Sequence, residues 1–375
     1  MAGVVFNSTL PISVRDTYTE FNQIDFLVQL KSNSIQKNSF RINGKLKVFP
    51  TGDYTGVADL NSGIFLNAFS GVSSLINVAS VSVNSTNTIE NIASFGRLVG
   101  MKKQAKYTLP QLTASSYASL ELCGNRNNQL LLGEVDQGGY ISFSLKIDNC
   151  LNNTMGNGDL HPAVIQELRL MLTMESALNA FHVNRPTSAV TAVSYLLKDL
   201  QLNWTEVPAA PKPEPIGMLT YFLTQQTLVS KVSNLSITTG NLPADSLSIS
   251  FIKQKNKSNV KRDNNLCEYL GEIERVEFEI NSSQSVNMYP LTSYGDIALN
   301  YYRSFSEPNM PLEKNSITSL ATFGTACFGV GVQYPESTAN LLTMSITIKD
   351  DARPENDPAT DAVDAYCYVN SMLQL

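Results

Sequence analysis

The chain has 375 residues, of which 43% are hydrophobic and only 16% charged, and its net charge is −6. Because a globular domain usually holds about 100 to 200 residues, this length favours two domains, each large enough to bury a core. The acidic balance argues against a protein that wraps nucleic acid, which needs clustered Lys and Arg against phosphate, so no specific nucleic-acid binding is expected.

Targeting signals and disulfide patterns are not visible in the sequence. The first residues lack the basic and apolar regions of a signal peptide, and the absence of a run of about 18 apolar residues argues against a membrane span. Asn-X-Ser/Thr sequons such as those that begin at Asn84, Asn234 and Asn281 are therefore interpreted as polar turns. The cysteines are widely spaced without a C-x-x-C pair, which indicates buried or unreactive thiols. They are Cys123, Cys150, Cys267, Cys327 and Cys367.

The chain begins with a series of predicted strands. Apolar and polar residues alternate over Ile24–Leu30, and the pattern returns over Phe40–Val48, on both sides of Asn43-Gly44. Between Gly52 and Gly71 the pattern gives way to turn residues. Alternation of this kind predicts strands that bury one face against a core.

More strands follow a polar loop over Gln104–Asn128. Clear alternation covers Tyr140–Ile147, Leu168–Glu175 and Tyr195–Val207. Strands that succeed one another without long helices between them favour an antiparallel, all-β architecture over a parallel one.

A proline-rich segment separates the chain into two halves. Pro208–Pro215 holds four prolines, each of which fixes φ and removes an amide donor, so the segment is predicted to be an extended, semi-rigid linker. The predicted organisation is a first domain over 1–207, a linker over 208–216 and a second domain over 217–375.

The second half repeats the strand pattern of the first. Alternation returns over Leu247–Phe251 and, after a basic turn, over Leu342–Lys349. Strands are also expected over Thr325–Tyr334, and Ala365–Val369 reads as the last strand of the sheet.

The two halves share one repeated sequence segment. Ile273–Phe305 reads as a second copy of Ile76–Met101, about 200 residues apart, and a single pair at this spacing indicates a duplicated domain. Each copy is a strand, an Asn/Ser turn and a segment of helical spacing, over Ile92–Lys103 and about Leu291–Phe305. The predicted fold is all-β: two tandem eight-stranded jelly-roll β-sandwiches, each with a short inserted helix.

A glycine begins the helical segment of each copy. We expect Gly96 and Gly295 to lie where backbone packs closely, since a residue without a Cβ allows the nearest approach. On this hypothesis Gly295→Val damages folding or assembly.

Motifs for catalysis or cofactor binding are absent from the sequence. The only histidines, His161 and His182, are interpreted as loop residues, and no G-x-S-x-G, Walker or dinucleotide motif occurs. The basic stretch Lys253–Lys257 with Lys261-Arg262 is interpreted as a solvated loop. The acidic stretch Asp350–Asp364 lacks the spacing of a calcium loop and is interpreted as a surface excursion. We therefore predict no catalytic residue, no cofactor site and no metal site.

A second class of function is a carbohydrate-binding or glycoside-cleaving protein with two β-sandwich domains. Aromatic side chains near the second helical segment are available as sugar platforms, although packing is their commoner use. They are Tyr289, Tyr294, Tyr301 and Tyr302, and the single tryptophan, Trp204, lies inside a predicted strand.

The repeated phrase and its neighbours resemble a known family. Ser74–Met101, Glu167–Phe181 and Ser194–Val207 are similar to parts of the first barrel of double jelly-roll major capsid proteins, and Ile273–Phe305 resembles the corresponding part of the second barrel. This family includes adenovirus hexon, tectivirus-type phage coats and virophage capsid proteins. The similarity extends over nearly the whole chain, from Phe26 to Tyr368, as patterns and without an invariant motif.

The resemblance implies a structural protein of the virion. In this family three copies form a homotrimer whose six jelly rolls make a pseudo-hexagonal tile, and such tiles cover the faces of an icosahedral shell, often above an internal membrane. The implied partners are the chain itself, neighbouring trimers, and penton and minor capsid proteins, with assembly inside the host cell. A related non-shell protein, such as a scaffold or vertex protein, is the alternative within the lineage.

Overall fold

The structure is a computed structural model of the chain. The residues that it describes are 4–56, 63–85, 87–108, 110–112, 114, 120–123, 136–183, 189–239, 243–268, 270, 273–280, 284–286, 290–305, 328–334, 341–349 and 357–374.

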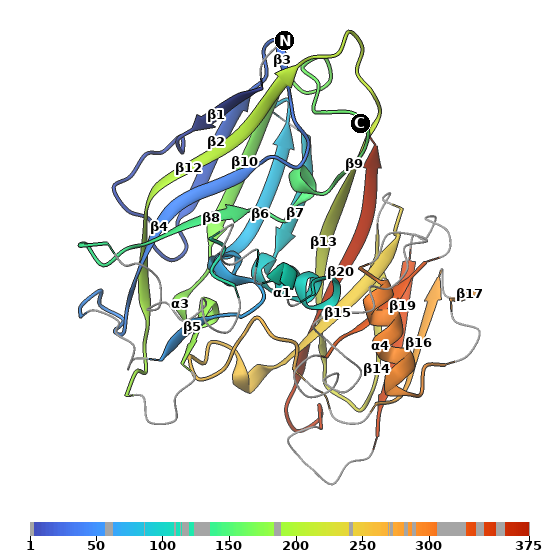
Figure 1. The fold of residues 1–375 in the computed structure, drawn as a ribbon. Coiled ribbons are helices and arrows are strands. Elements are labelled where there is room, and N and C mark those ends of the chain that lie inside the picture. Colours follow the sequence, from blue (N-terminus) through green and yellow to red (C-terminus); the bar gives the residue numbers. More distant parts are fainter. Residues whose placement is uncertain are drawn as a thin grey trace.

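Two antiparallel layers form the first roll (Figure 1). One layer has the strand order β1 (Val5–Thr9), β12 (Ser194–Pro208), β4 (Arg41–Phe49) and β8 (Ile141–Lys146), and β3 (Asn33–Ile35) pairs with β12. The other layer has the order β2 (Gln23–Gln29), β10 (Glu167–Met174), β6 (Ile76–Val83) and β7 (Asn87–Ala93).

The second roll reproduces the first strand for strand. Its layers have the order β13 (Ile216–Leu228), β20 (Val363–Gln374), β15 (Ser246–Lys253) and β18 (Val330–Gln333), and the order β14 (Val232–Thr238), β19 (Leu341–Ile348), β16 (Ile273–Ile280) and β17 (Gln284–Ser285). The prediction of an all-β protein with two tandem jelly rolls is thus confirmed.

The two copies of the sequence repeat occupy equivalent places. The first forms β6, β7 and the helix α1 (Phe95–Lys106), and the second forms β16, β17 and the helix α4 (Tyr294–Arg303). Both helices begin later than predicted. Ile92 still belongs to β7, and Leu291 pairs with Val276 of β16 in an isolated bridge.

The core of each sandwich is built by strand alternation. Ile24, Phe26 and Val28 of β2 are buried, while the side chains between them are partly exposed. β4 continues through Asn43-Gly44 without a break. A Cβ at Gly44 would lie 2.6 Å from Leu200 Cδ2, so glycine leaves the space that this inward-facing position needs.

A shared sheet joins the two rolls. β13 pairs in parallel with β7 at Phe222 and Asn91, and antiparallel with β9 (Thr154–Gly156). The nine-stranded sheet therefore runs from β18 to β2 across both rolls. β12 ends at Pro208 and β13 begins at Ile216, and we keep the division of the chain at 208–216 as a proposal.

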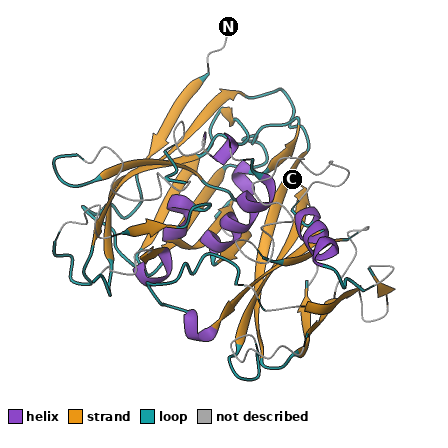
Figure 2. Cartoon of the chain, turned by 60° about the horizontal axis from the view of Figure 1, so that its bottom comes forward, coloured by secondary structure: helices purple, strands orange, loops and turns teal. Residues whose placement is uncertain are grey.

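Short elements fill the space around the rolls. They are β5 (Ile64–Leu66), which pairs with β11 (Phe181–Val183), the helix α3 (Ala177–Ala180), and the 3₁₀ turns η1 (Gly71–Leu75), η2 (Cys150–Asn152) and η3 (Gln254–Asn256). Figure 2 shows most of the helices near the middle of the molecule, among the strands of the two rolls.

Three predicted segments differ in extent from the observed elements. The strand expected within Thr325–Tyr334 is β18, residues 330–333, and residues 325–327 lie outside the described residues. The final strand, β20, extends to Gln374, beyond the predicted Ala365–Val369. About half of the polar loop predicted over Gln104–Asn128 lies outside the described residues, and its first three residues end α1.

Candidate functional site at the junction of the two rolls

Helix α1 lies buried between the rolls although it carries four cationic side chains. Every residue from Phe95 to Ala105 is buried, including Arg97, Lys102 and Lys103. Burying a charge costs several kcal/mol unless partners compensate it. The contacts of these three cations therefore determine how the junction is held together.

Two of the cations are paired with carboxylates. Lys102 Nζ lies 2.6 Å from Asp148 Oδ1, and Lys103 Nζ lies 2.7 Å from Glu121 Oε2. Burial alone would lower the pKa of Lys102, but the Asp148 carboxylate holds it above its ordinary value. Burial alone would raise the pKa of Asp148, but Lys102 lowers it to about 2. The Lys102–Asp148 pair is therefore ionised at neutral pH.

Glu90 links β7 to two other elements. Its side chain is buried, and its carboxylate accepts hydrogen bonds from the Cys150 amide at 2.9 Å and from the Tyr221 amide at 3.3 Å. Burial raises the pKa of Glu90 to about 7, against the lowering effect of these amides and of Lys102. Because Tyr221 belongs to β13, this carboxyl connects the first roll to the second.

Arg97 connects α1 to the second roll through neutral groups. Nη1 donates to Ser250 Oγ at 2.9 Å and to the Leu266 carbonyl at 3.0 Å, and Nη2 donates to the Asn264 carbonyl. The guanidinium carbon lies 4.6 Å from the centre of the Tyr366 ring, a cation–π contact. Among the described residues, none of its hydrogen-bond partners is a carboxylate.

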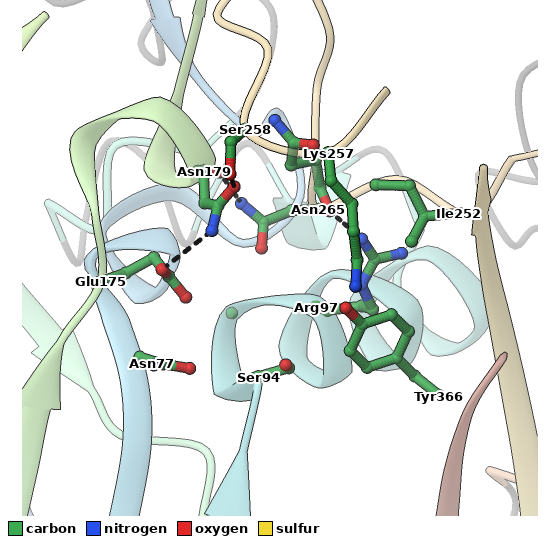
Figure 3. A pocket seen from close by; sticks show the side chains of 12 residues that line it. Asn77, Ser94, Arg97, Glu175, Asn179, Ile252, Lys257, Ser258, Asn265 and Tyr366 are labelled. Carbon is green, nitrogen blue, oxygen red and sulfur yellow. Dashed lines mark hydrogen bonds between the residues drawn. The ribbon is translucent and has the colours of Figure 1, made fainter. Parts of the chain in front are cut away.

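A polar cavity of 270 Å³ lies beside Arg97, with walls from both rolls. In Figure 3, Arg97, Lys257 and Tyr366 lie on one side, and Glu175 and Asn179 on the other. Asn179 Nδ2 donates to Glu175 Oε1 at 3.1 Å. The cavity is therefore cationic at one end and carries a hydrogen-bonded carboxylate at the other.

A second surface feature is an exposed apolar arm, residues 4–21. β1 is the edge strand of its layer, and the Ile12 amide donates to the Asp25 carbonyl of the other edge strand, β2, at 2.7 Å. The arm thus crosses the open side of the first roll. The exposed large apolar side chains on it are Val4, Val5, Phe6, Leu10, Ile12, Val14 and Phe21.

The histidines lie apart, and one was misassigned. His161 lies in a loop, with Nε2 2.8 Å from the Ala210 carbonyl oxygen. The prediction of a loop for His182 is wrong: this residue belongs to β11, where its ring stacks on Phe65 at 5.7 Å. Its position opposite Phe65 follows from the β5–β11 pairing, which the sequence did not indicate.

The basic and acidic stretches contact each other. Lys255 Nζ lies 2.8 Å from Asp361 Oδ2, and Lys257 Nζ pairs with Asp364. Residues 350–356 of the acidic stretch lie outside the described residues. Within the part of the chain that is described, no cluster of His, Cys, Asp and Glu has the arrangement of a metal site, and no helix is long and apolar enough to cross a bilayer.

The cysteines lie mainly in the core. Cys123, Cys150 and Cys367 are buried, and Cys267 is partly buried. All four are free thiols, and Cys327 lies outside the described residues. Burial raises the pKa of the Cys367 thiol to about 12, as expected for a packed and unreactive side chain.

The sequons do not all form turns. Asn84 lies at the turn between β6 and β7 with a positive φ of 50°, as predicted. Asn234 lies within β14, so the prediction of a turn there is wrong. Its backbone is paired with Ser345 of β19, and the strand pattern overrides the local turn preference. Asn281 lies outside the described residues.

The aromatic residues considered as sugar platforms are mostly enclosed. Tyr301 is fully buried and packs against Phe305 with ring centres 5.4 Å apart, and Trp204 is 8% exposed within β12. Tyr294 is 37% exposed at the start of α4, and Tyr302 is partly buried. Tyr289 lies outside the described residues.

The two glycines at the helix starts differ. A Cβ on Gly96 would lie 2.8 Å from Ser74 Cα, so close packing is present there. The corresponding expectation for Gly295 is wrong, because the nearest atom to its Cβ would be Ser293 Oγ at 3.8 Å. The start of α1 packs on the 3₁₀ turn η1, whereas the start of α4 is exposed.

The junction residues Glu90, Arg97, Lys102 and Lys103 were not predicted. One signal was present in the sequence: Phe95–Met101 holds six apolar or glycine residues around a single arginine, which is typical of a buried helix. The partners of these charges come from segments up to 169 residues away, and alternation within one strand gives no information about such contacts.

Comparisons with known proteins agree on the fold. No protein-family model and no curated protein matches the chain. The Faustovirus major capsid protein is similar with a TM-score of 0.61 at 9% identity, covering 100% of this chain and 91% of that protein. PBCV-1 VP54, in a structure fitted into a reconstruction of the virophage Sputnik, is similar with a TM-score of 0.58 at 11% identity, covering 100% of this chain and 95% of that protein. The mavirus major capsid protein is similar with a TM-score of 0.54 at 9% identity, covering 99% of this chain and 90% of that protein. The chain therefore has, over its full length, the double jelly-roll fold of viral major capsid proteins.

Proposed function

We propose that the chain is a major capsid protein that forms pseudo-hexagonal homotrimers on the faces of an icosahedral virus shell. The observation that supports this most is the pair of rolls with one strand order in a single chain, similar over its full length to viral major capsid proteins. Two rolls per chain and three chains per trimer give six equivalent corners of a tile.

The exposed arm, residues 4–21, supports self-association. Seven large apolar side chains are exposed on this short segment, and concentrated exposed apolar surface marks association sites. A standard interface buries about 800 Å² per partner. An edge strand with free backbone groups also invites pairing with another chain. We infer that a second copy of the chain covers the arm.

A structural role also fits the chemistry of the junction. The buried lysines of α1 contact carboxylates, and Arg97 contacts a hydroxyl, backbone carbonyls and an aromatic ring, all inside the fold, so these cations serve packing. The carbohydrate-binding alternative gains no support, because Trp204 and Tyr301 are buried and unavailable to stack on a sugar.

The proposed setting is the virion, with assembly inside the host cell. The partners are neighbouring trimers of the same chain, with penton and minor capsid proteins at the vertices and seams. An internal membrane beneath the shell is compatible with this arrangement.

Light scattering on the purified protein tests the proposal. We expect a particle of three times 41.1 kDa and hexagonal tiles in negative-stain images. A stable monomer at micromolar concentration would contradict it.

The role of the arm is tested by Phe6→Asp, since Phe6 is 84% exposed and its loss leaves the monomer core intact. We expect the variant to dissociate at concentrations where the wild type stays trimeric. Val229→Asp is the control, at a position 64% exposed but far from the arm in sequence, and it should stay trimeric. Equal behaviour of the two variants would refute the assignment of the arm.

A further inference from the structure

The cavity beside Arg97 is shared equally by the two rolls. Six of its lining residues precede the proline-rich linker and six follow it. Its volume of 270 Å³ is several times that of one water molecule, which occupies about 30 Å³ in the liquid. We propose that this cavity binds a small oxyanion that also carries a hydrogen-bond donor, with hydrogenphosphate as the simplest example, and that the bound anion connects the two rolls.

The Arg97 end of the cavity lacks a counter-charge. The guanidinium is 4% exposed and makes three hydrogen bonds, all to neutral oxygens, among the described residues. A guanidinium has five N–H donors, so two remain available. Lys257 is already paired with Asp364, whereas the charge of Arg97 is not matched by a carboxylate partner in the described chain. An oxyanion would supply both the charge and the acceptors.

The start of α1 adds a second attraction for an anion. Ser94 occupies the N-cap position with a left-handed φ of 48°, and its side chain accepts no capping hydrogen bond. The first amides of a helix have no partner within the helix, and the helix dipole favours negative charge there. Ser94, Gly96 and Arg97 all line the cavity, so this uncapped end faces the space beside the guanidinium.

An independent observation comes from Asn264, on the other roll. This side chain is 6% exposed and also lines the cavity. Nδ2 donates to the Leu178 and Asn259 carbonyls, which fixes the orientation of the amide, and Oδ1 has no donor. A buried acceptor left unpaired is costly. A ligand with an O–H group satisfies it, which is why the anion must carry a donor.

The single carboxylate in the lining is held away from the cation. Glu175 Oε1 accepts from the Ser176 amide at 2.9 Å and from Asn179, and Figure 3 places Glu175 across the cavity from Arg97 and Tyr366. The cavity therefore has distinct ends, and the anion belongs at the Arg97 end.

Ser258 offers a clean test because it is exposed, lines the cavity and makes only one weak side-chain contact, to Asn179 at 3.5 Å. Its φ of 53° suits Asp and Asn equally well. Ser258→Asp adds a negative charge at the cavity, and Ser258→Asn is the neutral control of the same shape.

Binding of inorganic phosphate is measured by calorimetry on the full chain at fixed ionic strength, near pH 6.5, with sulfate as an anion that carries no donor. We expect a single site in the wild type and in Ser258→Asn, at least tenfold weaker binding in Ser258→Asp, and at least tenfold weaker binding of sulfate. Arg97→Lys, which keeps the charge but loses the planar fork, should also weaken phosphate binding at least fivefold.

Three results would overturn the proposal. No phosphate binding in the wild type would mean that the cavity holds water only. Equal affinity of Ser258→Asp and Ser258→Asn would place the phosphate elsewhere. Equal affinity for sulfate and phosphate would show that Asn264 Oδ1 accepts no hydrogen bond from the bound anion. Each outcome leaves the oligomeric state, and so the proposed capsid role, to its own test.

Discussion

The contact between α1 and η1 makes Gly96 a sharp test of how the junction is packed. We expect Gly96→Ala to destabilise the protein, whereas Gly295→Ala, at the same place in the second copy, should be neutral or slightly stabilising. The added Cβ at position 96 would lie 2.8 Å from Ser74 Cα and 2.9 Å from the Ser73 carbonyl oxygen. These are backbone atoms of η1, so no side chain can turn aside to make room.

The magnitude follows from two opposing effects. Forcing one methyl group into a packed interior costs about 1–3 kcal/mol, and replacing a helical glycine by alanine gains up to about 1 kcal/mol. The net effect at Gly96 is a loss of about 1–2 kcal/mol. At Gly295 the nearest atom to the new Cβ would be 3.8 Å away, so only the gain remains. We expect the two variants to differ by about 2 kcal/mol.

Urea unfolding followed by circular dichroism measures this difference. The midpoint of Gly96→Ala should fall and that of Gly295→Ala should not, with unchanged slopes. Equal midpoints, or a lower midpoint for Gly295→Ala, would refute the argument that α1 alone is packed tightly at its start. Because the space around Gly295 is open, we no longer expect close packing to make Gly295→Val harmful.

Two further predictions concern the buried charges of the junction. The pKa of Glu90 is raised from 4.5 to about 7, so the folded state holds the proton of this carboxyl more tightly than the unfolded state. The protonated Glu90 therefore stabilises the fold fully below about pH 4.5. This contribution, up to about 3 kcal/mol, is lost as the pH rises to about 7. Thermal unfolding of Glu90→Gln should therefore vary less between pH 5 and 7.5 than that of the wild type, and an unchanged profile would contradict the assignment. Lys103→Met should cost about 3 kcal/mol in urea unfolding because it leaves Glu121 buried without its cation, whereas Lys103→Met with Glu121→Gln should recover a large part of the loss.

Alternation and duplication predicted the architecture of the fold. The alternation over Ile24–Leu30 and Leu168–Glu175 predicted two strands, which the structure places side by side as β2 and β10. The sequence repeat predicted that β6, β7 and α1 correspond to β16, β17 and α4. These signals are local: each strand records in its own sequence which face is buried. The resemblance to capsid proteins rests on the same patterns.

The site was not predictable in the same way. The alternation over Leu247–Phe251 predicted a strand with one buried face, but in β15 Ser248 and Ser250 are buried as well. Ser250 Oγ accepts a hydrogen bond from Arg97 of α1, and Ser248 Oγ lies 2.7 Å from Ser304 Oγ, next to the end of α4. A serine in a strand looks the same in sequence whether water or another chain segment satisfies its hydroxyl. Contacts between distant segments decide which of the two satisfies the hydroxyl, and such contacts cannot be predicted from the local pattern of one sequence.

The continuous sheet across the two rolls has a mechanical consequence. β13 is hydrogen-bonded to β20 over its whole length on one side and to β7 and β9 on the other, and Glu90 accepts from its Tyr221 amide. Relative rotation of the rolls would break the bonds of β13 to β7, β9 and Glu90, so the proline-rich segment does not act as a hinge and the two rolls form one rigid unit. In the shell that we propose, curvature therefore has to come from the angles between neighbouring copies of the chain.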